Sequence, residues 1–235
     1  MGSGSDGASI INRLLQNMAR QTRPSLVNLD FESEAHRGGY RLVAGLDEVG
    51  RGALAGPVVA AACILDPSAP LPEGLDDSKR LTRRERERIA DLLRRTALAF
   101  AVGLVSHDEI DRINILQATR RAMLVALAGL SPRADYLLID ALPLKESNLP
   151  QRAIIRGDSI SASIAAASVL AKTFRDSLMR DYHNVYPQYG FSSHVGYGTR
   201  AHLEALRAYG PCPIHRCSFR GVLPPVNEIS EAVSG

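Results

Sequence analysis

The hydrophobic and polar positions of this chain predict short buried strands that alternate with longer amphipathic helices. Five apolar runs of four to nine residues have the length and hydrophobicity of strands that are covered on both faces. These runs are 41–47, 58–65, 97–105, 136–139 and 153–156. Because stretches of helical length separate several of them, the pattern is typical of an α/β protein built on one sheet.

Two helix starts are marked by side chains that can bond the free amides of a first turn. Thr82 with Glu85, and Ser106 with Glu109, each have the spacing of a capping box. The helix that begins after Ser106 is predicted to end at Gly129, which suits a C-terminal cap.

Three further segments have helical spacing or composition. Residues 159–172 are rich in alanine and serine, so a helix there can approach the sheet closely. Residues 10–20 carry apolar positions at near-helical spacing, which predicts a short helix. The basic run 80–88 contains glutamates as well as arginines, which favours a solvated helix face over a nucleic-acid-binding surface.

Composition limits the classes of protein without choosing between them. A chain of 235 residues with 45% hydrophobic content can bury one sizeable core and a small second lobe. A net charge of +3 and a pI near 8.9 permit nucleic-acid binding without requiring it. The longest apolar run, 58–65, is too short to span a bilayer, and no signal peptide precedes it, so we expect a cytoplasmic protein.

The three cysteines, Cys63, Cys212 and Cys217, fit no disulfide framework and indicate a reducing compartment. Cys212, His215 and Cys217 could form part of a zinc knuckle, but the sequence offers no obvious fourth ligand. The zinc interpretation is therefore the weaker alternative.

The segment 45–57, GLDEVGRGALAGP, carries the first candidate chemistry. Asp47 and Glu48 lie where a buried strand leaves the sheet, and glycine-arginine-glycine follows at once. Successive side chains of a strand point to opposite faces, so we expect only Asp47 to point directly into a strand-end site. Glycines on both sides of Arg51 allow the backbone to approach a bulky ligand or to adopt positive φ. Taken alone, the segment is equally compatible with a polar turn.

Two more apolar runs lead to carboxylates. Asp140 closes one run, and Asp158 follows another through Gly157, at the start of a predicted helix. A single strand-end aspartate is usually a turn former or helix cap, but three of them together with Glu48 favour a common site. Two carboxylates about 4 Å apart repel by roughly 4 kcal/mol at an effective dielectric of about 20, so four acids in one place need cations. An all-oxygen ligand set favours Mg²⁺ or Mn²⁺ over zinc.

Six motifs, in order and at similar spacing, resemble those of the bacterial ribonuclease HII family. They are GLDEVGRGALAGPVVAAACIL, DDSKRLT, YLLIDAL, RGDSISASIAAASVLAK, YPQYGFSSHVGYGT and HRCSF, and the resemblance extends from about Leu42 to about Val222. The Ala-Gly-Pro in the first motif favours this family over its sister, ribonuclease HIII. The resemblance implies an α/β fold, a ribonuclease H-like mixed sheet flanked by helices, with a small helical C-terminal lobe. It divides the chain into an N-terminal extension (1–40), a catalytic core (41–182) and a substrate-binding lobe with a tail (183–235).

The resemblance also implies hydrolysis of the RNA strand of RNA–DNA hybrids with two divalent cations, Mg²⁺ or Mn²⁺. The catalytic metal ligands would be Asp47, Glu48, Asp140 and Asp158. Asp47 would bridge both ions, with Asp158 on the nucleophile side and Asp140 on the leaving-group side. The enzyme would also cut 5′ of single ribonucleotides embedded in duplex DNA and leave 5′-phosphate and 3′-hydroxyl ends. This activity would serve ribonucleotide removal and DNA repair.

By the same resemblance, substrate choice rests on the 2′-hydroxyl that separates RNA from DNA. Backbone groups of Gly50, Arg51 and Gly52 would line the ribose and bind this hydroxyl. Tyr197 of the GYGT segment would stack on the next sugar and accept only deoxyribose there. The alternative for Tyr197 is a packed aromatic residue beside two glycines.

Lys79 in the DSK segment and Lys172 near the end of its motif are candidate phosphate contacts. A surface lysine and a helix-end lysine are the respective alternatives. We expect a monomer without membrane association, whose partner is an RNA–DNA hybrid or a DNA duplex containing ribonucleotides.

Three sites depart from the family pattern. Ala141 stands where glycine usually follows the third acid, and Val195 replaces a common lysine before Gly196. Thr173 and Phe174 replace the usual residues after the helical lysine. Because the four acids are intact, these departures bear on phosphate contacts rather than on the chemistry.

Two other functions compete with this interpretation. Another nuclease of the ribonuclease H-like class, such as a junction resolvase or integrase core, would share the acids but not the GRG, DSK and GYGT segments. Cleavage of an all-DNA junction would favour it. A non-catalytic hybrid-binding protein would bind without metal and without cleavage, and the four retained acids argue against it.

Overall fold

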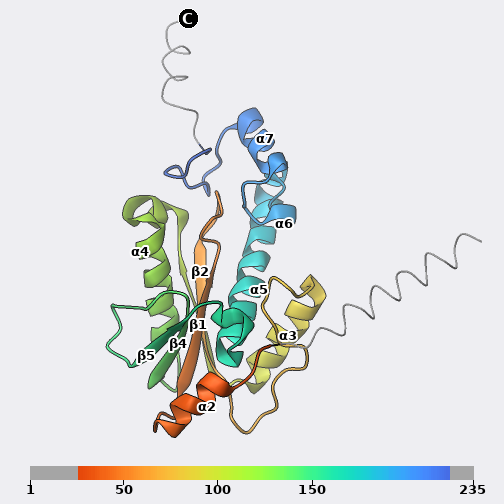
Figure 1. The fold of residues 1–235 in the computed structure, drawn as a ribbon. Coiled ribbons are helices and arrows are strands. Elements are labelled where there is room, and N and C mark those ends of the chain that lie inside the picture. The colour runs from red at the N-terminus through yellow and green to blue at the C-terminus, as the bar shows by residue number, and fades with distance from the viewer. Residues whose placement is uncertain (1–25, 223–235) are drawn as a thin grey trace, which may run out of the picture.

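The computed structural model describes residues 26–222, in which helices cover both faces of one sheet and continue into a small lobe (Figure 1). The strands are β1 (Val43–Val49), β2 (Val58–Ile64), β3 (Ala99–Val105), β4 (Tyr136–Asp140) and β5 (Gln151–Ile154). The helices are α2 (Asp30–Arg37), α3 (Arg83–Thr96), α4 (His107–Ala128), α5 (Ala162–Val185), α6 (Phe191–His194) and α7 (Arg200–Tyr209), with 3-10 turns η1 (Gly157–Ser159) and η2 (Pro187–Tyr189). The helix predicted at 10–20 lies outside the described residues.

The sheet is mixed and has the strand order β3-β2-β1-β4-β5. Strand β2 pairs antiparallel with both β1 and β3, whereas β4 pairs parallel with both β1 and β5. The chain passes from β3 to β4 through α4 and from β5 into α5. This arrangement confirms the predicted mixed sheet with flanking helices.

The second strand is buried on both faces because helices cover both. Val58 and Ala60 belong to the apolar cluster that includes α4 residues, whereas Val59 and Ala61 belong to the cluster that includes α3 and α5 residues. Strand side chains alternate between faces, so each layer receives every second residue of β2. Figure 1 shows α4 on one side of the sheet and α5 with α3 on the other.

Helix α5 packs directly on β1 because small residues line the contact. A Cβ atom on Gly45 would lie 2.0 Å from the carbonyl carbon of Ser163, so only glycine fits at this point of β1. Ala165, Ala166 and Ala167 on α5 are fully buried. The close approach brings the middle of α5 beside the end of β1, where the first two acids lie.

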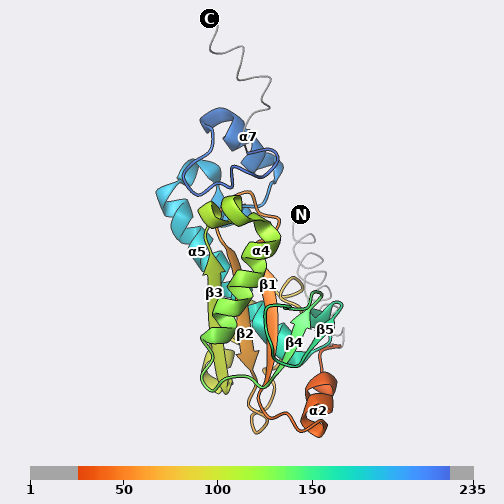
Figure 2. The ribbon, with the colours of Figure 1, turned by 90° about the vertical axis from the view of Figure 1, so that its left-hand side faces the viewer.

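The C-terminal part of α5 extends beyond the sheet and carries the small lobe (Figure 2). The 24 residues of this helix span about 36 Å at 1.5 Å per residue. Met179, towards the end of α5, packs into the apolar cluster of the lobe with Phe191 of α6 and Leu206 of α7. The division between 182 and 183 falls inside α5, so one helix joins the two parts. The division itself stays a prediction.

Predicted and observed boundaries agree within two residues for all five strands, and one helical segment differs more. Strand β5 occupies Gln151–Ile154 rather than 153–156, a shift of two residues along the chain. Asp158 lies in η1 and not in the first turn of α5, which begins at Ala162 and continues well beyond the predicted end at Lys172.

The capping predictions are confirmed at one helix and half confirmed at the other. At α3, Glu85 N donates to Thr82 Oγ1 at 3.3 Å, and Thr82 N donates back to Glu85 Oε2 at 2.7 Å. At α4, Ser106 Oγ accepts from Glu109 N at 3.4 Å, but the Glu109 carboxylate pairs with Arg121 instead of returning to the cap. A competing arginine on the same helix therefore replaced the second bond of this box.

Candidate active site

The parallel pairing of β1 and β4 brings the first and third acids together. Leu46 pairs with Ile139 across the two strands, so the next residues are Asp47 and Asp140. Neighbouring strands lie about 4.8 Å apart. The strand register therefore places two carboxylates side by side at one edge of the sheet.

Asp47 and Glu48 lie on opposite faces of β1, as the sequence predicted. Asp47 is 5% exposed and faces α5, where the nearby Ser168 hydroxyl favours the charged form of its carboxylate. Burial, followed by repulsion from Glu48 and Asp140, raises the pKa of Asp47 well above its ordinary value. Glu48 lines a pocket on the other face together with Arg51 and Asp140. The neutral form of Asp47 is thus favoured as long as no cation balances the charge.

Glu48 is tied to the arginine of the glycine-arginine-glycine segment. Arg51 Nη1 lies 3.2 Å from Glu48 Oε1. Burial raises the pKa of Glu48, and the nearby Arg51 guanidinium opposes this without cancelling it. The side chain of Arg51 therefore points back towards the acids.

Asp140 and Asp158 meet at the turn η1. Gly157 N donates to Asp140 Oδ1 at 2.8 Å, which orients the third acid. Burial and repulsion from Asp158 raise the pKa of Asp140. Asp158 is 4% exposed and accepts a 2.7 Å hydrogen bond from Lys79 Nζ. We call Asp47, Glu48, Asp140 and Asp158 the acidic cluster.

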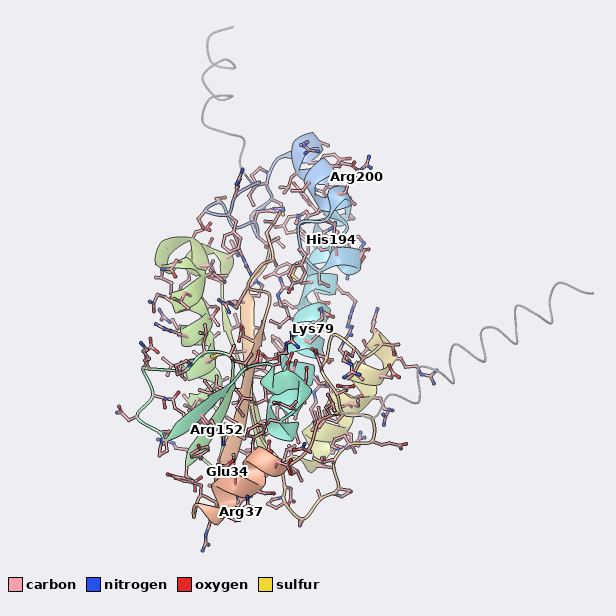
Figure 3. All side chains as sticks on the ribbon, in the orientation of Figure 1. Glu34, Arg37, Lys79, Arg152, His194 and Arg200 are labelled. Atoms are coloured by element: carbon pink, nitrogen blue, oxygen red, sulfur yellow. The ribbon has the colours of Figure 1, made fainter. Side chains whose placement is uncertain are left out.

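Lys79 reaches the acidic cluster from the loop between β2 and α3, and Figure 3 shows it beside α5 near the middle of the molecule. Arg86 of α3 holds this loop by donating to Ser78 O at 3.0 Å. Ser78 Oγ lies 2.8 Å from Ser168 Oγ on α5. Partial burial is the largest single effect and disfavours the charge on Lys79, but the hydrogen bond to Asp158 and the charges of Asp158, Asp77 and Asp47 together outweigh it and raise the pKa of Lys79.

Lys172 is placed differently from Lys79. It lies one helical turn beyond Ser168 on α5, and its Nζ donates to Asp176 Oδ1 at 2.7 Å. Asp176 Oδ2 also lies 3.6 Å from Arg86 Nη2. Lys172 is therefore near the acidic cluster along the helix but paired with a different carboxylate.

The first glycine of the glycine-arginine-glycine segment is required by packing. Gly50 has a φ of +90°, and a Cβ atom on it would lie 2.2 Å from Arg175 Nε. Arg175 is fully buried on α5 and donates to three backbone carbonyls, at 3.0, 3.1 and 2.9 Å, those of Pro57, Ala55 and Val195. The space that a side chain at position 50 would need is thus already filled.

A second buried arginine holds the same loop. Arg216 donates to Gly56 O at 2.9 Å and to Arg51 O at 3.0 Å. Burial, together with repulsion from Arg175, lowers the pKa of Arg216 to about 9. The segment 50–57 is therefore fixed through its carbonyl groups by two buried guanidinium groups.

Tyr197 lies against this loop. A backbone bridge joins Tyr197 to Ala53. The Tyr197 ring atom Cε1 lies 4.0 Å from the position of a Cβ atom on Gly52, and Arg175 Cζ lies 5.6 Å from the ring centroid. The structure thus brings Gly50, Gly52 and Tyr197 together, although they belong to distant motifs.

The carboxylates of the acidic cluster are engaged by Lys79, Arg51 and a backbone amide. Within residues 26–222, no three histidine, cysteine, aspartate or glutamate side chains converge closely enough to ligate one ion. The contacts of His215 argue against a zinc knuckle, because Cys212 N donates to its Nδ1 at 2.9 Å and its Nε2 lies 3.0 Å from His202 Nε2.

Two departures from the family pattern occupy left-handed backbone positions. Ala141 has a φ of 57° and Val195 a φ of 45°. A left-handed residue other than glycine costs roughly 1–2 kcal/mol. Ala141 N donates to Ile154 O at 2.9 Å, so the chain accepts this strain in the turn directly after Asp140.

The residues that hold the site were missed by the sequence analysis. They are Ser78, Arg86, Ser168, Arg175 and Arg216. The composition of 159–172 indicated close packing but not a bond from Ser168 to Asp47. Burial of the two arginines had no sequence signal, because arginine is normally an exposed residue.

The mixed sheet, the helices on both faces and the acids at the ends of β1 and β4 define a nuclease of the ribonuclease H-like class. A family model described as Ribonuclease HII matches residues 44–222. The Ribonuclease HII of Chlamydia caviae is 56% identical to this chain over 190 residues, covering 80% of this chain and 89% of that protein. This chain belongs to the ribonuclease HII family and is an endoribonuclease that acts on RNA–DNA hybrids.

Solved structures agree with the fold. The crystal structure of the ribonuclease H2 from Pyrococcus horikoshii OT3 superposes with a TM-score of 0.69 at 26% identity, covering 82% of this chain and 98% of that chain. The crystal structure of Bst-RNase HIII in complex with Mn²⁺ has a TM-score of 0.59 at 20% identity, covering 85% of this chain and 72% of that chain. In the part of the chain that the structure describes, no helix is long and apolar enough to cross a bilayer.

Proposed function

We propose that this endoribonuclease cuts 5′ of ribonucleotides, including a single ribonucleotide embedded in duplex DNA, and leaves 5′-phosphate and 3′-hydroxyl ends. The observation that carries the proposal is that Tyr197 Cε1 lies 4.0 Å from the place where a Cβ atom on Gly52 would be, in the loop that directly follows Asp47 and Glu48. Groups that could recognise a sugar, around Gly52 and Tyr197, therefore lie next to carboxylates that could support phosphodiester hydrolysis.

The donor atoms of the acidic cluster suit two divalent cations, Mg²⁺ or Mn²⁺, although the four carboxylates would have to move closer together to hold them. All of its donors are carboxylate oxygens, which such hard ions prefer. Burial and mutual repulsion raise the pKa of Asp47, Glu48 and Asp140, which is the expected state of acids whose charge a cation normally balances. The fold neighbour Bst-RNase HIII was crystallised with Mn²⁺. When bound, the two ions would lower the pKa of the attacking water and stabilise the leaving 3′-oxygen.

The four acids would share this task unequally. Asp47, which lies beside both Glu48 and Asp140, is the proposed ligand of both ions. Asp158 is assigned to the nucleophile side and Asp140 to the leaving-group side. Ser168 and the Gly157 amide would keep two of these carboxylates oriented before cations arrive.

Recognition of the ribose is assigned to the loop held by Arg175 and Arg216. Backbone groups of Gly50, Arg51 and Gly52 would bind the 2′-hydroxyl, and the fixed carbonyls keep that loop in one conformation. A site that hydrogen-bonds a hydroxyl can reject the analogue that lacks it by about 10⁴ to 10⁵. Tyr197 would stack on the next sugar and exclude a second 2′-hydroxyl.

Phosphate contacts are assigned to Lys79 and, less directly, Lys172. Cations at the acidic cluster would compete with Lys79 for Asp158, and its ammonium group could then turn to a substrate phosphate. Lys172 would have to leave Asp176 to do the same. The two lysines therefore differ in the carboxylate that each must leave, which is Asp158 for Lys79 and Asp176 for Lys172.

The test is a DNA duplex with one embedded ribonucleotide, incubated with Mg²⁺ or Mn²⁺, with the cut mapped to the nucleotide and the end groups identified. A matched all-DNA duplex and an all-DNA four-way junction serve as controls. We expect one cut 5′ of the ribonucleotide and no cut in either control. Cleavage of the all-DNA junction would instead favour a resolvase-like activity, and binding without cleavage would favour a non-catalytic hybrid-binding protein.

We further propose that the enzyme acts as a cytoplasmic monomer in ribonucleotide removal and DNA repair. Free cysteines at Cys63, Cys212 and Cys217 support a reducing compartment. The proposed parts are an extension (1–40), a catalytic core (41–182) and a substrate-binding lobe (183–235). Light scattering of the full chain at increasing concentration tests the monomer.

A further inference from the structure

Three histidines form a buried network in the lobe. His194, labelled in Figure 3, ends α6, His202 lies on α7 and His215 follows α7, and their exposed fractions are 9%, 0% and 2%. The rings of His194 and His202 stack with centroids 4.5 Å apart. His202 Nε2 and His215 Nε2 lie 3.0 Å apart. The hydrolysis proposed above uses none of these imidazoles.

The partners of His202 and His215 define where their protons are. His202 Nδ1 lies 2.9 Å from Tyr197 O, a carbonyl that can only accept, so His202 carries its hydrogen on Nδ1. A neutral His202 therefore presents a bare Nε2 to His215. The 3.0 Å contact then requires a hydrogen on His215 Nε2. The shorter of the two contacts of His215 Nδ1 with Cys212 agrees with this tautomer, because Cys212 N can only donate and lies 2.9 Å away, whereas Cys212 O lies at 3.2 Å.

His194 completes the network. Gly196 N donates to His194 Nδ1 at 3.2 Å, and His194 Nε2 lies 2.7 Å from Tyr189 O, so the hydrogen is on Nε2. Burial lowers the pKa of all three histidines, that of His215 to about 4. Each ring nitrogen thus has a complementary partner in the neutral state, and His215 Nδ1 has the Cys212 carbonyl at 3.2 Å in addition. A proton added to His202 Nε2 or to His194 Nδ1 would face another donor.

The network holds the backbone of one residue from both sides. Tyr197 N donates to His194 O at 2.9 Å, and Tyr197 O accepts from His202 Nδ1. His215 is in turn bridged to Ala55 of the loop that follows the glycine-arginine-glycine segment. The histidines therefore connect the Tyr197 segment to the segment that Tyr197 faces.

We propose that His202, held in its Nδ1–H tautomer by His215, is a positioning residue for Tyr197 and so sets the junction selectivity of the enzyme. The proposal rests on the role of Tyr197 given above. Tyr197 O also accepts a hydrogen bond from Thr199 N at 2.8 Å, so His202 Nδ1 is one of two donors that fix this carbonyl. Loss of the His202 donor would leave the carbonyl held by Thr199 alone, which gives the ring more freedom to move away from Gly52 while the acidic cluster stays intact.

A matched pair of substitutions separates positioning from simple support of the fold. In His202→Asn the amide nitrogen lies where Nδ1 was and can still donate to Tyr197 O. In His202→Gln the amide reaches the place of Nε2, so the contact with His215 survives but the donor to Tyr197 O is lost. Both variants remove the ring and its stacking on His194.

The readout is the ratio of kcat/KM on a single embedded ribonucleotide to kcat/KM on a continuous RNA–DNA hybrid. We expect His202→Asn to stay within about twofold of the wild-type ratio. His202→Gln should lower the ratio towards that of Tyr197→Ala, and the double variant should lower it no further than Tyr197→Ala alone. Equal losses of His202→Gln on both substrates, with an unchanged ratio, would overturn the proposal.

The same series distinguishes failure of this inference from failure of the proposed function. If the wild type has no junction preference, or Tyr197→Ala leaves it unchanged, the assigned role of Tyr197 is wrong. If Tyr197→Ala acts as expected and His202→Gln does not, only the positioning role is wrong.

A measurement on the unaltered protein covers the case in which His202→Gln does not fold. Nitrogen-15 NMR of the imidazole rings reports each tautomer directly. We expect Nδ1–H on His202 and Nε2–H on both His194 and His215 at neutral pH. An Nε2–H tautomer or a charged ring at His202 would contradict the proposal.

Discussion

Lys79 Nζ lies 2.7 Å from Asp158 Oδ2, so one member of the acidic cluster is paired with a cation of the chain itself. The same ammonium group is attracted by Asp77 and Asp47. Four carboxylates in one place are costly without positive charge. Without metal, Lys79 supplies part of that charge, and under the proposed roles of the acids and of Lys79 one side chain would link metal binding to phosphate binding.

Lys79→Ala is expected to affect metal and substrate in opposite directions. The variant should need less Mg²⁺ for half-maximal activity, because the competing cation is gone. The slope of log K for substrate binding against log salt concentration should be shallower by about one unit. On B-form DNA each neutralised phosphate is expected to contribute about −0.9 to this slope. Binding and activity titrations measure both, and Lys145→Ala, at an exposed lysine, is the control. An unchanged slope would reduce Lys79 to a partner of Asp158.

Asp47→Asn should abolish cleavage while it leaves hybrid binding largely intact, because it removes a shared metal ligand but not the recognition loop. The folded-state pKa of Asp47 lies above its unfolded value, so its ionised form opposes folding at neutral pH without metal. The variant should therefore melt higher in EDTA, by about 2–4 °C for each kcal/mol of repulsion removed. Thermal melts with and without Mg²⁺ test this. Cleavage within tenfold of wild type would exclude Asp47 from the mechanism.

Tyr197→Ala should lower the rate at a single embedded ribonucleotide more than at a continuous hybrid. The substitution removes both the stacking surface and the steric exclusion of a 2′-hydroxyl. Tyr197→Phe should keep most of the preference, since stacking uses the ring rather than the hydroxyl. Values of kcat/KM for the three proteins on both substrates provide the comparison. Equal losses on both substrates would leave junction selectivity to Gly50, Arg51 and Gly52.

The His215 imidazole should make the protein acid-sensitive. Burial lowers its folded-state pKa to about 4 from 6.5, so the unfolded state binds the proton more tightly. The Cys212 carbonyl, 3.2 Å from His215 Nδ1, opposes this shift of the pKa, while the nearby His202, His107 and His194 add to it. Stability is therefore fully present above about pH 6.5 and falls as the pH drops towards 4, by about 2 kcal/mol at pH 5.

Urea unfolding of wild type and His215→Gln at about pH 7.5 and pH 5 measures this contribution. The carboxylates of the acidic cluster affect stability with the opposite pH dependence, but both proteins contain them. Their contribution therefore cancels when the losses of stability of the two proteins are compared. The wild type should lose about 2 kcal/mol more than the variant between these pH values. Equal losses would mean that His215 is not the buried neutral base described above.

Ala141→Gly should stabilise the protein, by up to about 1 kcal/mol, because the left-handed φ of 57° is strained for alanine. Greater freedom of glycine in the unfolded chain reduces the gain. Ala128→Gly, at an exposed position in the last turn of α4, should be destabilising and serves as the control. Chemical unfolding of both variants decides the sign. A destabilised Ala141→Gly would show that the turn after Asp140 is not strained.

The sequence by itself determined the strands, the helix starts at Thr82 and Ser106, and the family, because these depend on local patterns and contiguous motifs. The apolar runs that form β2 and that precede Asp47 depend only on neighbouring residues, so the sequence carries them directly. The boundary of β5 was misplaced because the turn at Gly157 to Ser159 belongs to no run of its own. The Glu109 carboxylate was misassigned because its partner, Arg121, lies beyond the kink that Asn114 makes in α4, and this kink brings the two side chains together.

Only the tertiary structure decided how the site is held. The pairing of Leu46 with Ile139, the bond from Lys79 to Asp158 and the buried guanidinium of Arg175 join residues from distant parts of the chain. Contacts of this kind depend on strand register and on helix packing at Gly45, which no local pattern encodes. The sequence therefore names the acids, while the fold determines their neighbours, their proton affinity and the loop that faces Tyr197.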